Sequence, residues 1–135
     1  MTSAERHPVA YFSMEFALLS HIPTYSGGLG VLAGDFARAA ADIGFPLVGV
    51  TLLPRRGYLY QRLDASGNQT EEPELWPVQD YLREVEATCE VDVEGRRVLL
   101  HAWRYDVVGA GGSVVPVFFL DTDVDMSRVI EHRAA

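Results

Sequence analysis

Residues 25–35 read Tyr-Ser-Gly-Gly-Leu-Gly-Val-Leu-Ala-Gly-Asp, and this stretch decides the fold. Three of the four residues 27–30 are glycine. From Leu29 onward, apolar residues recur at the spacing of one helix face, and Gly44 and Pro46 then end the helix. A glycine-rich turn at the start of a helix exposes backbone N–H groups at the positive end of the helix dipole. A phosphate or a sugar hydroxyl can approach such a turn closely, although a tight helix start without any ligand explains the glycines equally well.

Apolar runs on both sides of this helix complete a strand–helix–strand unit. Residues 9–16 and 47–53 are short, bulky and mostly apolar, which is typical of buried strands. A βαβ unit of this kind forms a parallel sheet with a right-handed crossover, and its ligands bind at the carboxyl ends of the strands. The glycines lie at that end of the unit.

The second half of the chain predicts antiparallel strands. Apolar residues alternate with acidic ones over 84–94, which indicates a half-exposed strand, and a turn at Glu94-Gly95 leads into a partner strand over 97–105. A third strand is expected over 114–120. The fold class is therefore α/β: a Rossmann-like βαβ unit followed by an antiparallel strand meander.

The region between the two halves predicts little regular structure. We expect a short strand over 57–63, a turn over 64–68 and an acidic, proline-bounded loop over 71–77. The chain as a whole divides into a loose N-terminus over 1–7, the βαβ unit over 8–54, a β-rich half over 55–124 and a tail over 125–135.

Composition excludes several classes of function. The net charge of −8 argues against nucleic-acid binding. We find no apolar stretch that suits a signal peptide or a membrane span, so the expected location is the cytoplasm. All eleven basic residues are arginine, and without lysine the chain cannot form a Schiff base. No metal site is expected, and the single cysteine, Cys89, is expected to be a small buried apolar residue.

Five polar residues have both a functional and a structural interpretation. Glu15 lies in an apolar run, where a carboxylate is costly unless it belongs to a site or turns to solvent. His21 and Tyr25 flank the glycines and either contact a sugar or pack locally. Arg55 and Arg56 either bind phosphate or belong to the surface.

Several segments resemble one family closely. Residues 9–16 (VAYFSMEF), 23–35 (PTYSGGLGVLAGD), 41–50 (ADIGFPLVGV) and 56–64 (RGYLYQRLD) are similar, in order and spacing, to the N-terminal domain of bacterial α-glucan (glycogen or maltodextrin) phosphorylases. Residues 74–77 and 119–123 resemble later strands of the same domain.

This resemblance implies a partial N-terminal domain, residues 1–135, of a two-domain GT-B type glycosyltransferase. Such enzymes cleave α-1,4-glucans with inorganic phosphate and release glucose 1-phosphate. By resemblance, Gly27 and Gly28 contact the phosphate, Leu29 touches the glucosyl unit, and Glu15 lines the same cleft. Pyridoxal phosphate is held by a lysine of the C-terminal domain, so we expect no cofactor and no catalytic residue in this chain alone. Pro54 and Arg56 depart from the usual family pattern.

The expected partners are α-1,4-glucan, phosphate and glucose 1-phosphate, together with either a C-terminal half or further copies of the chain. The chain alone is expected to be inactive. A non-catalytic glucan- or sugar-binding module, or one subunit of a split enzyme, is the alternative. A glycogen or starch synthase also has a Gly-Gly-Leu-Gly loop, but Tyr25 and Ser26 occupy the place of its lysine, so we rank it lower.

Overall fold

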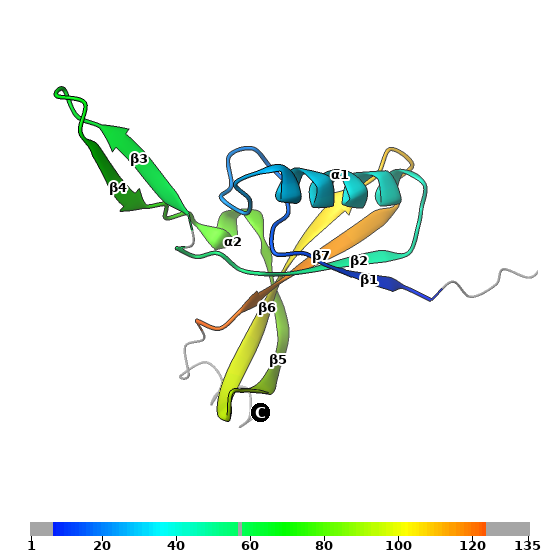
Figure 1. Cartoon of the computed structure of the whole chain (residues 1–135). Coiled ribbons are helices and arrows are strands. Elements are labelled where there is room, and N and C mark those ends of the chain that lie inside the picture. The colour runs from blue at the N-terminus through cyan, green and yellow to red at the C-terminus, as the bar shows by residue number, and fades with distance from the viewer. Residues whose placement is uncertain (1–6, 57, 124–135) are drawn as a thin grey trace, which may run out of the picture.

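A computed structural model describes residues 7–56 and 58–123, in which one helix covers one face of a five-stranded sheet and a separate hairpin projects to the side (Figure 1). The sheet order is β1-β2-β7-β6-β5, and β3 and β4 form the hairpin. The elements in chain order are β1 (Val9–Phe12), α1 (Gly28–Asp42), β2 (Leu47–Leu52), β3 (Leu59–Leu63), β4 (Gln69–Pro73), α2 (Val78–Tyr81), β5 (Arg83–Val93), β6 (Arg96–Val108) and β7 (Val114–Asp121). The predicted N-terminal segment, except for residue 7, and the predicted tail lie outside the described residues.

The predicted βαβ unit is confirmed. β1 and β2 run parallel, with Val9 opposite Leu47, and α1 connects them. Gly44, just after the helix, has a φ of +64°, the left-handed conformation that favours glycine at this position. β1 is shorter than the predicted run over 9–16, because the chain then leaves the sheet. The N–H of Phe16 donates to Thr24, and that of Ala17 donates to Gly30.

The predicted meander of β5, β6 and β7 is also confirmed, and β7 joins it to the βαβ unit. β7 runs antiparallel to β6 and parallel to β2, with Val117 opposite Gly49. The α/β fold is therefore one continuous mixed sheet. Glu94 and Gly95 have φ angles of +51° and +74°, as the predicted tight turn between β5 and β6 requires.

The core lies between α1 and the sheet. The buried face of α1 consists of small residues, and buried Val115, Val117 and Phe119 of β7 belong to the same apolar cluster. Small side chains allow the helix to lie close to its neighbours. A Cβ atom on Gly34 would lie 2.2 Å from the carbonyl oxygen of Ala17, so glycine is required there.

Two predictions about the second half are wrong, the first of them in part. Of the segment expected to be a loop over 71–77, residues 71–73 belong instead to β4, because the turn at Gly67 (φ +81°) sets Leu63 opposite Gln69. Residues 74–77 have no regular secondary structure, as predicted. β5 is not half-buried: Cys89, expected to be buried, is exposed, and of the eleven residues of β5 only Val85 is partly buried. The reason is that α1 lies over β2, β7 and β6 and does not extend over the edge strand β5.

Candidate functional site

The start of α1 is open to solvent. Gly27 has an extended backbone (φ −155°, ψ −162°), and no side chain caps the helix. A Cβ atom on Gly27 or Gly28 would meet nothing within 4 Å. Because the first N–H groups of any helix lack partners within the helix, a polar ligand can reach the backbone here. Leu29, in the same turn, is exposed and adds an apolar surface.

Gly30 has a different role from the two glycines before it. A Cβ atom on Gly30 would lie 2.4 Å from the Cβ atom of Tyr25 and 3.1 Å from the Oε2 atom of Glu15. Its carbonyl oxygen accepts a 2.8 Å hydrogen bond from the N–H of Ala17. Gly30 therefore allows the segment after β1 to pack directly against the start of the helix.

Glu15 is fixed beside the glycines by three hydrogen bonds. Its carboxylate accepts from the Ser26 N–H (3.3 Å), the Ser26 hydroxyl (3.1 Å) and the Tyr58 hydroxyl (3.3 Å). The hydrogen bond from the Ser26 backbone, ahead of the others, lowers the pKa of Glu15 below its ordinary value. Glu15 is therefore a held, ionised carboxylate next to Gly27.

Tyr58 belongs to this arrangement, although no local pattern in the sequence singles out its side chain. Burial, and then the charge of Glu15 and the hydrogen bond to it, raises the pKa of Tyr58 to about 12. Tyr58 is therefore a neutral hydrogen-bond donor at physiological pH. The one signal in the sequence is its place in the 56–64 segment that carries the family resemblance.

Arg55 has a structural role rather than an open phosphate-binding one. Its guanidinium contacts the buried Asp121 carboxylate at 2.6 Å, and the Trp103 indole N–H donates to the same carboxylate at 3.1 Å. Burial acts to raise the pKa of Asp121, but the hydrogen bonds from Arg55, the Asp123 N–H and Trp103, with the charge of Arg55, lower it overall. The neighbouring Arg56 is exposed.

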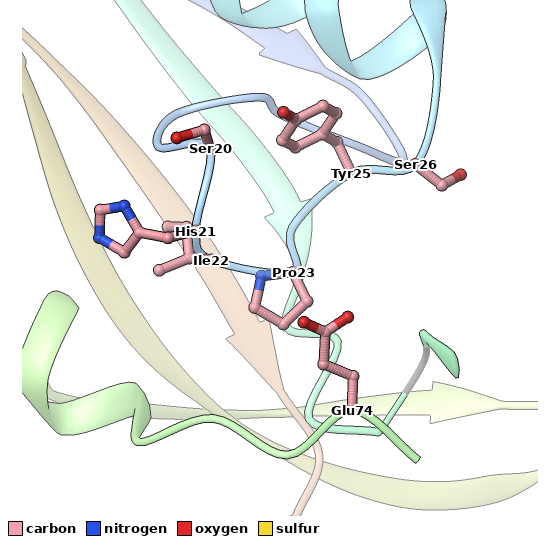
Figure 2. A pocket seen from close by; sticks show the side chains of 7 residues that line it. All are labelled: Ser20, His21, Ile22, Pro23, Tyr25, Ser26 and Glu74. Atoms are coloured by element: carbon pink, nitrogen blue, oxygen red, sulfur yellow. The ribbon is translucent and has the colours of Figure 1, made fainter. Parts of the chain in front are cut away.

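An open pocket of about 280 Å³ adjoins the glycine turn (Figure 2). One wall is the loop that leads into α1, which carries both His21 and Tyr25. The other is the segment after β4, from which the Glu74 side chain extends toward Pro23 (Figure 2). The lining residues are Ser20, His21, Ile22, Pro23, Tyr25, Ser26 and Glu74.

The described residues contain no group of three or more histidine, cysteine, aspartate or glutamate side chains placed to hold a metal ion. Neither helix in the described ranges has the length and apolar character needed to cross a membrane.

An α/β sheet with an uncapped glycine-rich helix start next to a polar pocket is the kind of site that binds phosphorylated or hydroxylated small molecules. No protein-family model matches the chain. Over 124 residues it is 38% identical to the maltodextrin phosphorylase of Thermococcus litoralis, and over 124 residues it is 40% identical to the glycogen phosphorylase of Mycobacterium tuberculosis. It is 32% identical over 127 residues to the glycogen phosphorylase of Aquifex aeolicus.

These matches cover 86–89% of this chain but only 14–18% of the three relatives. An uncharacterized protein of Methanocaldococcus jannaschii is 38% identical over 132 residues, and the match covers 24% of it. The predicted resemblance is confirmed: the chain is homologous to an N-terminal portion of maltodextrin and glycogen phosphorylases.

Proposed function

We propose that this chain forms one wall of the active site of an α-glucan phosphorylase, which cleaves α-1,4-glucan with inorganic phosphate and releases glucose 1-phosphate. The observation that carries the proposal is the open turn at Gly27 and Gly28 with the Glu15 carboxylate held beside it. The homology to phosphorylases over most of the chain supports the same reaction.

In this proposal, the turn at Gly27 and Gly28 carries the phosphate contacts, because a side chain at either position would occupy the approach to the backbone. The exposed Leu29 contacts the apolar face of the glucosyl unit. The Glu15 carboxylate repels a phosphate in direct contact with it, so its role is to orient Ser26 and to accept hydrogen bonds from sugar hydroxyls.

The cofactor of the family, pyridoxal phosphate, does not fit the residues of this chain. The cofactor is held through a lysine, and none of the 135 residues is lysine. Its binding site, and the second domain of a GT-B type enzyme, therefore require polypeptide other than these 135 residues. The lone Cys89, with no second cysteine to pair with, agrees with a reducing, cytoplasmic location.

Several large apolar side chains on α1 and around the end of β1 are exposed to solvent. Monomeric proteins rarely leave large apolar areas in solvent. Because the chain spans between 14% and 24% of the length of the curated relatives, the occupant we propose for this patch is the remainder of a phosphorylase. The exposed residues are Phe12 and Met14 around the end of β1, Leu29, Leu32 and Phe36 on α1, and Ile43 just after it.

A second candidate is a non-catalytic glucan-binding module or one subunit of a split enzyme. The absence of lysine from the sequence favours it, since the chain by itself cannot carry the cofactor. This candidate shares the sugar contacts of the first and differs in whether phosphorolysis follows.

A binding experiment tests the proposed site. Glucose 1-phosphate, titrated into the ¹⁵N-labelled chain, is expected to shift the backbone amide signals of Gly28 and Leu29. Gly28→Ala adds a methyl group in open space, so it folds normally and weakens binding about 10-fold or more. Gly111→Ala is the matched control, because its Cβ atom also meets nothing within 4 Å. Unshifted signals at the glycine turn would contradict the proposal.

A chimeric enzyme distinguishes the two candidate functions, the phosphorylase and the non-catalytic binding module. The matching segment of the Thermococcus litoralis maltodextrin phosphorylase is replaced by this chain, and glucose 1-phosphate release from maltoheptaose and phosphate is measured. Activity that Gly28→Ala removes and Gly111→Ala keeps supports the phosphorylase. A chimera with a cooperative thermal transition and no activity supports the binding module.

A further inference from the structure

The Glu15 carboxylate lies where it can compete with an anion for the start of α1. Its Oε2 atom accepts from the N–H of Ser26 at 3.3 Å, and Ser26 directly precedes Gly27, the N-cap residue of the helix. The hydrogen bond from the Ser26 backbone has the largest effect on the pKa of Glu15 and lowers it, and the Gly27 N–H lowers it further. A carboxylate is a strong acceptor for the N–H groups at a helix start. A small shift of this side chain would therefore occupy the donors that the proposed function assigns to phosphate.

Glu15 has little free space between the segment after β1 and the first turn of α1. A Cβ atom on Gly30 would lie 3.1 Å from both the Cβ atom and the Oε2 atom of Glu15. The carboxylate therefore packs directly on the helix start, because Gly30 has no side chain. Any change in the orientation of Glu15 acts on the same turn of helix that the phosphate approaches.

The Tyr58 hydroxyl holds this carboxylate from outside the turn. It donates to the Oε1 atom of Glu15 at 3.3 Å, the same atom that accepts from the Ser26 hydroxyl at 3.1 Å. Ser26 belongs to the loop that leads into the helix, whereas Tyr58 is 43 residues away from Glu15 along the chain. Tyr58 is therefore the donor that fixes the carboxylate relative to a different part of the protein.

The backbone around Tyr58 is itself anchored. The N–H of Glu74 donates to the carbonyl oxygen of Tyr58 at 2.9 Å. Three residues earlier, the Arg55 guanidinium binds the buried Asp121 carboxylate at 2.6 Å, which attaches this part of the chain to the end of β7. The phenol is half-buried and extends from a fixed backbone. A donor that is already positioned loses little entropy when it holds its acceptor.

We propose that Tyr58 is a positioning residue of the glycine turn. By holding the Glu15 carboxylate on Ser26, it prevents that carboxylate from capping α1. The N–H groups of Gly27 and Gly28 then stay free for the phosphate. Tyr58 itself touches neither phosphate nor sugar in this role, since it acts through Glu15. The role rests on the proposed function, because it has an effect only where the turn binds an anion.

A double-mutant cycle tests this role. Glucose 1-phosphate is titrated into the ¹⁵N-labelled 135-residue chain and its variants, and binding is followed at the Gly28 amide signal. Tyr58→Phe removes only the hydroxyl group, and we expect it to weaken binding about 5-fold, the size of one hydrogen bond. In the Glu15→Gln background, the side chain has no charge and is a poor helix cap. The same substitution should there change binding less than about 2-fold.

Tyr60→Phe is the matched control. Tyr60 lies in the exposed strand β3, where its ring faces the Arg62 guanidinium at 4.8 Å, so the loss of its hydroxyl should leave binding unchanged. Thermal transitions show whether each variant folds.

A second measurement uses the ligand-free chain, in which the Ser26 amide signal follows the titration of Glu15. After the hydrogen bond from the Ser26 backbone, which has the largest effect, the bond from Tyr58 also lowers the pKa of Glu15. Tyr58→Phe should therefore move this titration to higher pH. A loss of overall stability in a chain that remains folded would not move it.

The outcomes separate the positioning role from the proposed function. A loss of binding in Tyr58→Phe that disappears in the Glu15→Gln background supports both. If glucose 1-phosphate shifts the Gly28 signal and Tyr58→Phe binds it as the unmodified chain does, the positioning role is wrong and the function stands. An equal loss in the two backgrounds also contradicts the role, because Tyr58 would then not act through Glu15. If the Gly28 signal does not shift even in the unmodified chain, both are wrong.

Discussion

The sheet beneath α1 and the β3–β4 hairpin are ordered by different forces. Under the helix, Val115, Val117 and Phe119 are fully buried, whereas every residue of the hairpin strands is exposed and Leu63 is 74% exposed. The hairpin projects away from the sheet (Figure 1). An isolated two-stranded hairpin is marginal in water, so its order must come from local polar contacts.

Those local contacts are concentrated at the turn and across the strands. The Asp64 carboxylate accepts from the N–H groups of Ser66 and Asn68, both at 2.8 Å. Arg62 pairs with Glu72 at 3.1 Å and lies over the ring of Tyr60. The comparison shows that one chain combines a region stabilised by burial with a region stabilised by turn chemistry, and mutations in the two must differ in cost.

The largest expected effect tests this comparison directly. Phe119→Ala empties a fully buried position and is expected to reduce the free energy of unfolding by about 4 kcal/mol. Leu63→Ala, in the hairpin, is expected to change it by about 0.5 kcal/mol or less. Urea unfolding followed by tryptophan fluorescence measures both. Equal losses would show that the hairpin packs against something in solution.

The second prediction, with a smaller expected loss of stability, concerns Gly34, where α1 packs against the segment after β1. Gly34→Ala places a Cβ atom 2.2 Å from a backbone oxygen of Ala17, so the helix must shift, with an expected loss of about 3 kcal/mol. Gly111→Ala, in open space, is the control and is expected to be close to neutral. A loss of similar size in both variants, measured by thermal unfolding, would indicate a general effect of removing glycine.

The third effect concerns the ion pair at the end of β7. Asp121→Asn removes the charge that Arg55 and Trp103 bind, with an expected loss of about 2 kcal/mol at pH 7. Because the pKa of Asp121 is lower in the folded chain than in the unfolded one, this stability exists above a pH of about 4 and disappears as the pH falls through the folded pKa. Urea unfolding across this pH range should show the two proteins converging in acid. A constant difference would contradict the assignment.

The fourth effect is a loss of stability of about 1 kcal/mol or less, expected for Tyr58→Phe, which removes one hydrogen bond to Glu15. Its clearer signature is spectroscopic. With a pKa of about 12, Tyr58 ionises after an ordinary tyrosine, and its contribution to stability is lost as the pH rises from about 10 toward 12. Alkaline titration of the phenol absorbance should lose its last step in Tyr58→Phe. In Glu15→Gln that step should move to lower pH.

Much of the fold was predictable, because periodicity and turn residues are local. The helix from Leu29, the stop at Gly44 and the turn at Glu94-Gly95 follow from short patterns that no distant contact overrides. The position of β7 between β2 and β6 was not predictable, since a hydrophobic pattern does not specify which strands pair. The exposure of Cys89 was missed for the same reason: alternation indicates a strand, but only the position of α1 decides which strands are covered.

Several residues of the candidate site were predictable from the sequence, but the long-range hydrogen bonds around them were not. Glu15 and the glycines stood out because a carboxylate and a glycine run are unusual at those places in a sequence. The Tyr58 hydroxyl reaches Glu15 from a segment far along the chain, and Arg55 finds Asp121 across a similar separation. Such long-range contacts depend on the assembled sheet and leave no local pattern.

The central position of β7 also determines the order in which the protein can fold. The βαβ unit is complete in sequence at Leu52, yet the free edge of β2 has no partner until Val114–Asp121 leaves the ribosome. Contacts between residues so far apart slow folding, and an unpaired strand edge is a template for aggregation in the meantime. During synthesis, therefore, the half of the chain that carries the glycine turn is protected from aggregation only after β7, the last of the described strands, has been made.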